Sequence, residues 1–325
     1  MAYSASVLRR AKERLEQDRQ AAASADERRI SAIYEKYPRL REIDQQLQST
    51  VAKIAFAAFS SGGDVHEALE KAKEENLSLQ QERSWILQAN DLEEADLERQ
   101  PICPDCGGTG YVGEVMCGCL KELCRQEQKK DLSALLAGRE TFDGFRLDYY
   151  PEGEIRRDME RIKTACMDYA KNFAPGAPSM LFTGGPGLGK THLSACIARQ
   201  VAESGYSVVY DTAMQMFSDF EAAKFGSFEE DRRAKTEKYL QCDLLIIDDL
   251  GTELSTQFTQ SALYRVINDR MVSQRATIIS TNLSPDELKE RYLPQIVSRL
   301  FGTFKLRCFR GQDIRMLRRM KGAQE

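Results

Sequence analysis

A glycine-rich segment holds the residue types needed to bind a polyphosphate. It runs from Gly184 to Thr191 and fits the pattern G-x-x-x-x-G-K-[ST]. Its glycines allow the backbone to fold round phosphate groups, and a helix starting near Gly189 adds its positive end. Lys190 is expected to neutralise the β and γ phosphates and the Thr191 hydroxyl to ligate magnesium. The predicted nucleotide contacts are Gly184, Gly185, Pro186, Gly187, Leu188, Gly189, Lys190, Thr191 and His192.

Two acids follow an apolar run and supply the second half of such a site. Leu244–Ile247 is expected to be a buried strand beside the strand of the glycine loop, and Asp248 and Asp249 come directly after it. Asp248 is expected to hold magnesium through water, and Asp249 to orient or deprotonate the attacking water. The alternative is a capped strand without chemistry.

An amide side chain is the third candidate. Asn282 follows the predicted strand Thr277–Ser280. At a strand tip beside the γ phosphate it would position water and report whether that phosphate is present. The alternative is a turn residue ahead of the helix cap formed by Ser284, Pro285 and Glu287.

Four cysteines have the spacing of a metal site. Cys103 and Cys106 form C-x2-C, and Cys117 and Cys119 form C-x-C ten residues later. Four thiolates without a competing histidine predict a structural Zn(Cys)4 site, with Cys124 as an alternative fourth ligand. An iron-sulfur cluster or plain thiols are the other interpretations.

The predicted elements that would position these residues are helices in the first part of the chain and alternating strands and helices further on. Residues 1–99 are rich in helix formers, with capping-box spacing at Ser24 and again at Asp64. Strand-length apolar runs alternate with helical segments further on and predict a parallel sheet with helices on both faces. The predicted strands are Met180–Thr183, Ser207–Tyr210, Leu244–Ile247 and Thr277–Ser280. The predicted domains are a helical arm (1–100), a cysteine module with its following helix (101–138) and an ATPase domain (139–325).

Composition narrows the class of protein. The chain has 325 residues, 42% hydrophobic and 30% charged, with nine cysteines and two histidines. The N-terminus lacks the apolar stretch of a secretory signal, so a cytoplasmic location is expected. Residues 303–322 hold seven basic residues against Asp313 alone, although the net charge is −4. Such a basic end attracts phosphate, or is a solvated helix face.

Four motifs in order resemble one family. They are GGPGLGKTHL at 184–193, LLIIDDLG at 244–251, IISTNLSPDEL at 278–288 and IVSRLFG at 296–302. The chain is similar to the DnaC and DnaI type of bacterial helicase loader, an AAA+ ATPase group shared with the IstB transposition helpers. The resemblance covers roughly residues 141–320.

The resemblance implies roles for single residues. Lys190 and Thr191 would bind phosphate and magnesium, Asp248 and Asp249 would serve magnesium and water, and Asn282 would be the first sensor. Arg299 matches the arginine finger that completes a neighbouring subunit's site, and the segment 142–145 matches one that packs near the adenine. Asp249 stands where many related ATPases have Glu, which implies slow hydrolysis. The chain ends too soon for a full helical lid, and Arg315 is the best placed substitute for the lid's sensor arginine.

The family also implies a function. ATP, Mg2+ and Zn2+ would be the cofactors, and the chain would load a DnaB-type hexameric replicative helicase onto single-stranded DNA when replication begins. The zinc-bearing N-terminal region would dock on the helicase, and the ATPase domain would self-associate. The alternatives are an IstB-like transposition helper and a zinc-dependent adaptor that binds nucleotide without turnover.

Overall fold

The computed structural model describes residues 3–60, 65–135, 140–225 and 229–322. The chain forms two compact units, one of Met1–Glu13 with Gly118–Glu325 and the other of Arg14–Cys117. The division into three domains stays a prediction, because the two compact units do not show which segments fold independently. Among the described helices, none is long and apolar enough to cross a membrane.

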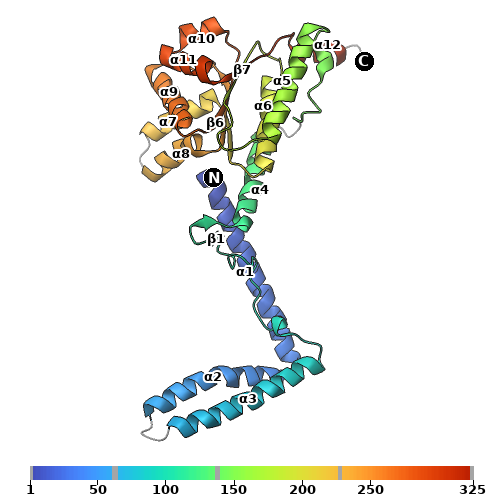
Figure 1. Cartoon of the computed structure of the whole chain (residues 1–325), viewed down its shortest axis with the longest axis vertical. Coiled ribbons are helices and arrows are strands. Elements are labelled where there is room, and N and C mark those ends of the chain that lie inside the picture. The colour runs from blue at the N-terminus through green and yellow to red at the C-terminus, as the bar shows by residue number, and fades with distance from the viewer. Residues whose placement is uncertain (1–2, 61–64, 136–139, 226–228, 323–325) are drawn as a thin grey trace. The chain divides into compact units, whose positions relative to one another are not determined.

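A parallel sheet forms the centre of the first unit, as predicted (Figure 1). Its order is β4-β5-β6-β3-β7 within the described residues. The strands are β3 (Met180–Thr183), β4 (Val208–Thr212), β5 (Leu244–Leu250), β6 (Ala276–Thr281) and β7 (Lys305–Cys308). β7 was not among the strands predicted from the sequence, since KLRC alternates charged and apolar residues and is too short to stand out.

Helices cover both faces of this sheet because side chains alternate along each strand. Leu244 and Ile246 pack into one apolar core with α5 and α6, whereas Leu245 and Ile247 pack into a second core with α7 to α11. The helices are α5 (Glu154–Lys171), α6 (Lys190–Glu203), α7 (Ala213–Phe225), α8 (Glu229–Gln241), α9 (Gln257–Val272), α10 (Pro285–Arg291) and α11 (Pro294–Thr303). A last helix, α12 (Ile314–Gly322), follows β7.

Two segments that precede the sheet in the chain contact the edge strand β4 and the residues just ahead of it. The Gln128 side chain, on α4 (Gly118–Leu135), accepts a hydrogen bond from Val208 N (2.9 Å) and donates one to Tyr206 O (2.9 Å). Tyr3 Oη donates to Gly205 O at 3.0 Å. Since an open sheet edge invites pairing with other chains, these contacts protect the edge and make the start of the chain part of the unit that holds the sheet.

The second unit is mostly helical. It contains the rest of α1 (Ala5–Lys36), the helices α2 (Pro38–Ser60) and α3 (Val65–Ala89), a 3-10 turn η1 (Glu94–Asp96) and the short hairpin of β1 (Tyr111–Val112) and β2 (Val115–Met116). α2 and α3 lie side by side (Figure 1). The Arg83 guanidinium on α3 contacts the Asp44 carboxylate on α2 at 2.6 Å.

The predicted helix start at Ser24 is wrong. α1 continues through this position, and the Ser24 carbonyl accepts a hydrogen bond from the Arg28 side chain. Ser24 stands between Ala23 and Ala25, and alanine has the highest helix propensity, so the helix continues. The second predicted start, at Asp64, lies outside the described residues.

A buried arginine joins three elements at the amino end of the sheet. Arg270, on α9, is fully buried. Its guanidinium donates to Tyr239 O (2.8 Å), Cys242 O (2.9 Å) and Ala276 O (2.6 Å), so it binds the end of α8 and the approaches to β5 and β6. The planar fork of an arginine suits several fixed carbonyls at once.

Replacing Arg270 by methionine should lower the free energy of unfolding by about 3 kcal/mol, because several buried carbonyls lose their donors. Chemical denaturation measures this change. Arg265→Met is the matched control, since Arg265 is exposed and pairs loosely with Asp269 at 3.6 Å. Equal unfolding midpoints for the two variants would contradict the structural role of Arg270.

Candidate functional site

The glycine loop joins β3 to α6 and needs glycine for steric reasons. Gly189 has φ of 88°, and a Cβ there would lie 2.6 Å from the Phe145 ring. Gly184 has φ of 139°, and a Cβ there would lie 2.3 Å from the carbonyl oxygen of Phe309. The loop is therefore packed between Phe145 and the segment that follows β7, which fixes its path.

The Lys190 ammonium group lies inside this loop. Its Nζ donates to Gly184 O (2.6 Å), Gly185 O (2.7 Å) and Asn282 Oδ1 (2.7 Å). Burial lowers the pKa of Lys190 to about 8, and the nearby carboxylates of Asp249 and Asp248 offset part of this effect. A buried cation held only by neutral oxygens would gain from the approach of an anion.

The acidic strand does not pair with the strand of the glycine loop, so the predicted adjacency is wrong. β6 pairs with both β3 and β5 and lies between them. This order places Asn282, at the end of β6, between Lys190 and the acids. Strand order depends on long-range pairing, which the local sequence does not encode.

Asp248 is buried and held by hydroxyl groups. Tyr210 Oη donates to its Oδ2 at 2.8 Å, Ser280 Oγ donates to its Oδ1, and Thr191 Oγ1 lies 3.4 Å from Oδ1. The structure thus brings Thr191 and Asp248 together as predicted for a magnesium site, since magnesium prefers oxygen ligands. Tyr210 and Ser280, which orient the carboxylate, were not identified from the sequence.

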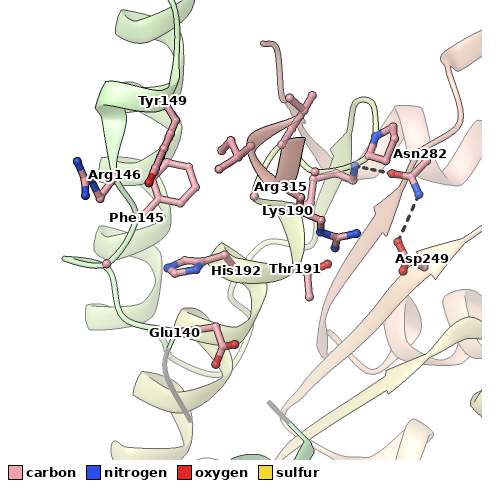
Figure 2. Close-up of a pocket in the computed structure, with 16 residues that line it drawn as sticks. Glu140, Phe145, Arg146, Tyr149, Lys190, Thr191, His192, Asp249, Asn282 and Arg315 are labelled. Carbon is pink, nitrogen blue, oxygen red and sulfur yellow. Dashed lines mark hydrogen bonds between the residues drawn. The ribbon is translucent and has the colours of Figure 1, made fainter. Parts of the chain in front are cut away.

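Asp249 lies at an irregularity within β5. Its φ is 54°, and the register between β5 and β6 shifts between Ile247 and Leu250. Burial, together with the charge of Asp248, raises the pKa of Asp249. Asn282 Nδ2 lies 3.5 Å from Asp249 Oδ1. Asn282 therefore connects Lys190 to Asp249, as Figure 2 shows.

A cavity of about 320 Å³ is lined by Lys190, Thr191, Asp249 and Asn282, whereas the buried Asp248 is not among its lining residues. Thr191, Asp249 and Asn282 line one side, and Phe145 and Tyr149 line the other (Figure 2). The other lining residues are Glu140, Gly144, Arg146, Pro186, Gly187, Leu188, Gly189, Lys190, His192, Ile314 and Arg315. The cavity is thus polar at the glycine loop and aromatic at the far wall, which suits a nucleotide with its phosphates on the loop.

The structure separates Arg299 from this cavity. Arg299, on α11, donates to Tyr264 Oη and Asn268 Oδ1, each at 3.0 Å, and does not line the cavity of its own chain. The arginine lies on the surface of the domain, and its role in a neighbouring subunit stays a prediction. Arg315 does line the cavity, and its charge acts on both Lys190 and Asp249.

A family model agrees with this site. The model for the IstB-like ATP binding protein matches residues 125–295, slightly more than half of the chain. The chain belongs to this family. The matched residues include the glycine loop, both acids and Asn282. Arg299, Arg315 and the four clustered cysteines lie outside them.

Individual relatives of this IstB-like protein are identical to it at about a quarter of the aligned residues. The replicative helicase loader DnaC of Buchnera aphidicola (subsp. Baizongia pistaciae) is 26% identical over 141 residues, 43% of this chain and 57% of the relative. DnaC of Escherichia coli K12 is 25% identical over 147 residues, 45% of this chain and 59% of the relative. The chain thus spans less than two thirds of these loaders.

Solved structures give similar matches. The crystal structure of the DnaC helicase loader aligns with a TM-score of 0.46 at 21% identity, over 53% of this chain and 97% of that one. The crystal structure of DnaI aligns with a TM-score of 0.45 at 18% identity, over 55% and 93%.

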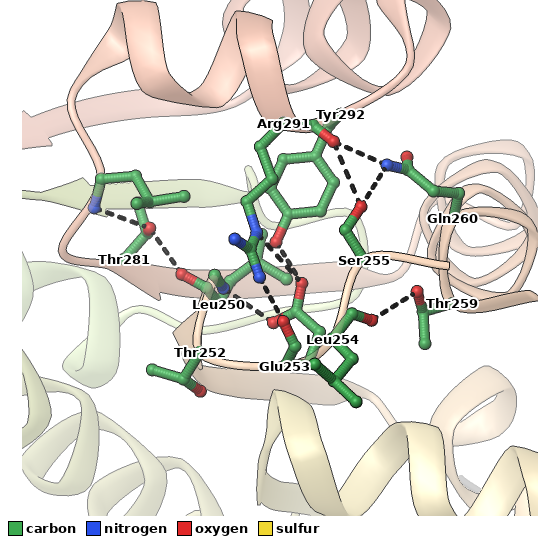
Figure 3. Close-up of polar contacts among 12 residues, drawn as sticks. Leu250, Thr252, Glu253, Leu254, Ser255, Thr259, Gln260, Thr281, Arg291 and Tyr292 are labelled. Atoms are coloured by element: carbon green, nitrogen blue, oxygen red, sulfur yellow. Dashed lines mark hydrogen bonds and ion pairs between the residues drawn. The ribbon is translucent and has the colours of Figure 1, made fainter. Parts of the chain in front are cut away.

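The loop after β5 of this IstB-like domain is fixed by a buried acid that sequence reasoning missed. The Glu253 carboxylate accepts hydrogen bonds from Gly251 N (2.8 Å) and Tyr292 Oη (2.5 Å), and Arg291 donates to the Glu253 carbonyl. Gln260 Nε2 donates to Arg291 O at 2.7 Å (Figure 3). The strand that carries Asp249 is therefore tied to the segment between α10 and α11. A lone glutamate in a loop carries no signal that would have revealed this role.

Four of the nine cysteines form a group, as predicted. The sulfur atoms of Cys103, Cys106, Cys117 and Cys119 lie within 4.8 Å of one another, and those of Cys103 and Cys117 are 3.8 Å apart. A tetrahedron with Zn–S bonds of about 2.3 Å has S–S edges of about 3.8 Å, so the group is compatible with a zinc module. Cys124 is outside the group, and burial raises the pKa of its thiol to about 11, which disfavours the thiolate.

We expect one zinc ion per chain after gel filtration, measured by atomic absorption. Cys119→Ser should lose the metal, because a structural site needs its four ligands, whereas Cys124→Ser should retain it. Iron in place of zinc, or loss of zinc in Cys124→Ser alone, would contradict this ligand set.

Proposed function

We propose that this protein is an ATPase that loads the replicative DNA helicase onto single-stranded DNA when replication begins. The observation that carries the ATPase part is the connected set of Lys190, Asn282 and Asp249, which lines one cavity together with Thr191. The Thr191 hydroxyl lies 3.4 Å from the buried Asp248 carboxylate. The loader part rests on relatives named as replicative helicase loaders.

Each residue of the site would have its own role in ATP binding or hydrolysis. The β and γ phosphates would replace the carbonyls and the Asn282 oxygen as partners of Lys190. Thr191 and Asp248 would hold magnesium, which neutralises phosphate charge. Asp249 would accept a proton from the attacking water, and its raised pKa makes the carboxylate a stronger base. Asn282, released by Lys190, would then orient the water.

Self-association would complete the site. Arg299 is held by Tyr264 and Asn268 and does not line the cavity of its own chain, so its guanidinium would serve the site of a second copy. Because an arginine from a neighbouring subunit stabilises the transferred phosphate in such enzymes, hydrolysis would depend on assembly, and ATP would act as a timing switch for release of the loader.

The N-terminal helices would hold the helicase. On α3, the side chain of Trp85 is 70% exposed and that of Leu77 is 58% exposed. They are eight positions apart, just over two helical turns, so both lie on one apolar stripe of the helix. Exposed large apolar groups of this kind are typical of protein interfaces.

Lys190→Ala should abolish ATP turnover, and Asp249→Asn should lower kcat about 100-fold or more while leaving the dissociation constant for ATP nearly unchanged, because a general base acts only in the transition state. Steady-state phosphate release with single-stranded DNA and helicase present measures both. Lys289→Ala, an exposed lysine paired with Asp286, is the control. No turnover by the wild type under any of these conditions favours the adaptor alternative.

The double variant Leu77→Ala/Trp85→Ala should lose capture of the cognate hexameric helicase in a pull-down, because the apolar anchors are gone. ATP binding should persist. Leu254→Ala is the matched control, since Leu254 is 85% exposed on the ATPase unit. Full capture by the double variant would contradict docking through this helix.

A further inference from the structure

A second cavity lies at the opposite end of the sheet from the nucleotide cavity. The glycine loop follows Thr183, the last residue of β3, whereas this cavity is lined by Met180, the first residue of that strand. The end of α5, the loop 174–178 and the edge strand β7 supply the other walls. Its volume is about 580 Å³, and it shares no lining residue with the nucleotide cavity.

The charge of this cavity is positive. Lys305 and Arg307 both line it. They are two positions apart on β7, so they project from the same face of the strand. The one carboxylate among the lining residues belongs to the exposed Asp168. Two cations against one acid leave the cavity suited to an anion.

Two buried donors in the wall lack partners. Arg307 Nε and Tyr169 Oη are both inaccessible to solvent and make no hydrogen bond. Burial raises the pKa of Tyr169, so the phenol keeps its proton and remains a donor. An unpaired buried donor is unfavourable, and anionic oxygens bound in the cavity that these two residues line would supply acceptors for both.

We propose that this cavity binds a phosphate group, with the backbone of single-stranded DNA as its source. The cavity falls in the size range of small-molecule sites, larger than a lone phosphate needs, and its wall includes the exposed rings of Pro175 and Pro178, against which a sugar or base can pack. The proposal gives a role to part of the basic C-terminal segment. The choice of DNA as the source rests on the proposed function.

The test measures binding of a thymidine oligonucleotide by fluorescence anisotropy at several salt concentrations. Loss of one phosphate contact to a single strand reduces the slope of log K against log[salt] by about 0.7. Lys305→Ala should show this reduction together with weaker binding, and Tyr169→Phe should bind more weakly with the slope unchanged. Lys289→Ala should match the wild type. ATP affinity should be the same in all four proteins.

The outcomes separate this proposal from the proposed function. Binding by the wild type with unchanged affinity and slope in Lys305→Ala would overturn the phosphate site and leave the loader intact. If the wild type binds no oligonucleotide, the DNA part of the loader function fails. In that case, calorimetry with inorganic phosphate tests the phosphate site by itself. A heat of binding in the wild type that is lost in Lys305→Ala supports the site, with a free phosphate compound as its ligand. No heat of binding in the wild type overturns the site.

Discussion

The buried charge of Lys190 is the constraint on which the rest of the site depends. An ammonium group removed from water must be surrounded by oxygen atoms. Two loop carbonyls and Asn282 supply them, which requires the glycine loop to turn inward and requires β6 to end beside it. An anion would compete with these oxygens for the ammonium group, so the group that organises the loop would also be the one that responds to a phosphate.

A series of contacts leads from Lys190 towards the part of the surface that carries Arg299. Asn282 joins Lys190 to Asp249, and the loop that follows Asp249 is tied through Glu253 to Tyr292, just ahead of α11. α11 carries Arg299. A change at the proposed phosphate site would therefore have a path, partly through hydrogen bonds and partly along the chain, towards the surface proposed to meet a second subunit.

Several features could be predicted because their causes are local. The glycine loop needs small residues at fixed positions, the cysteine group needs ligands a few residues apart, and the Ser284–Glu287 capping box acts across a single turn, where the structure has it. The alternation of apolar runs with helical segments likewise predicted a parallel sheet with two covered faces. By contrast, Ser24 had the local pattern of a cap, yet the helix-forming residues around it continue the helix.

The sequence by itself determined which chemistry is present: a phosphate loop, two acids, an amide and four thiols, each recognisable because residue type and close spacing decide it. Only the tertiary structure decided their arrangement. It placed β6 between the loop and the acids, gave Asp248 its Tyr210 and Ser280 partners, kept Arg299 away from its own cavity and brought Lys305 and Arg307 to a second one. These contacts join residues far apart in the chain, and their energies come from packing that no short stretch of sequence contains.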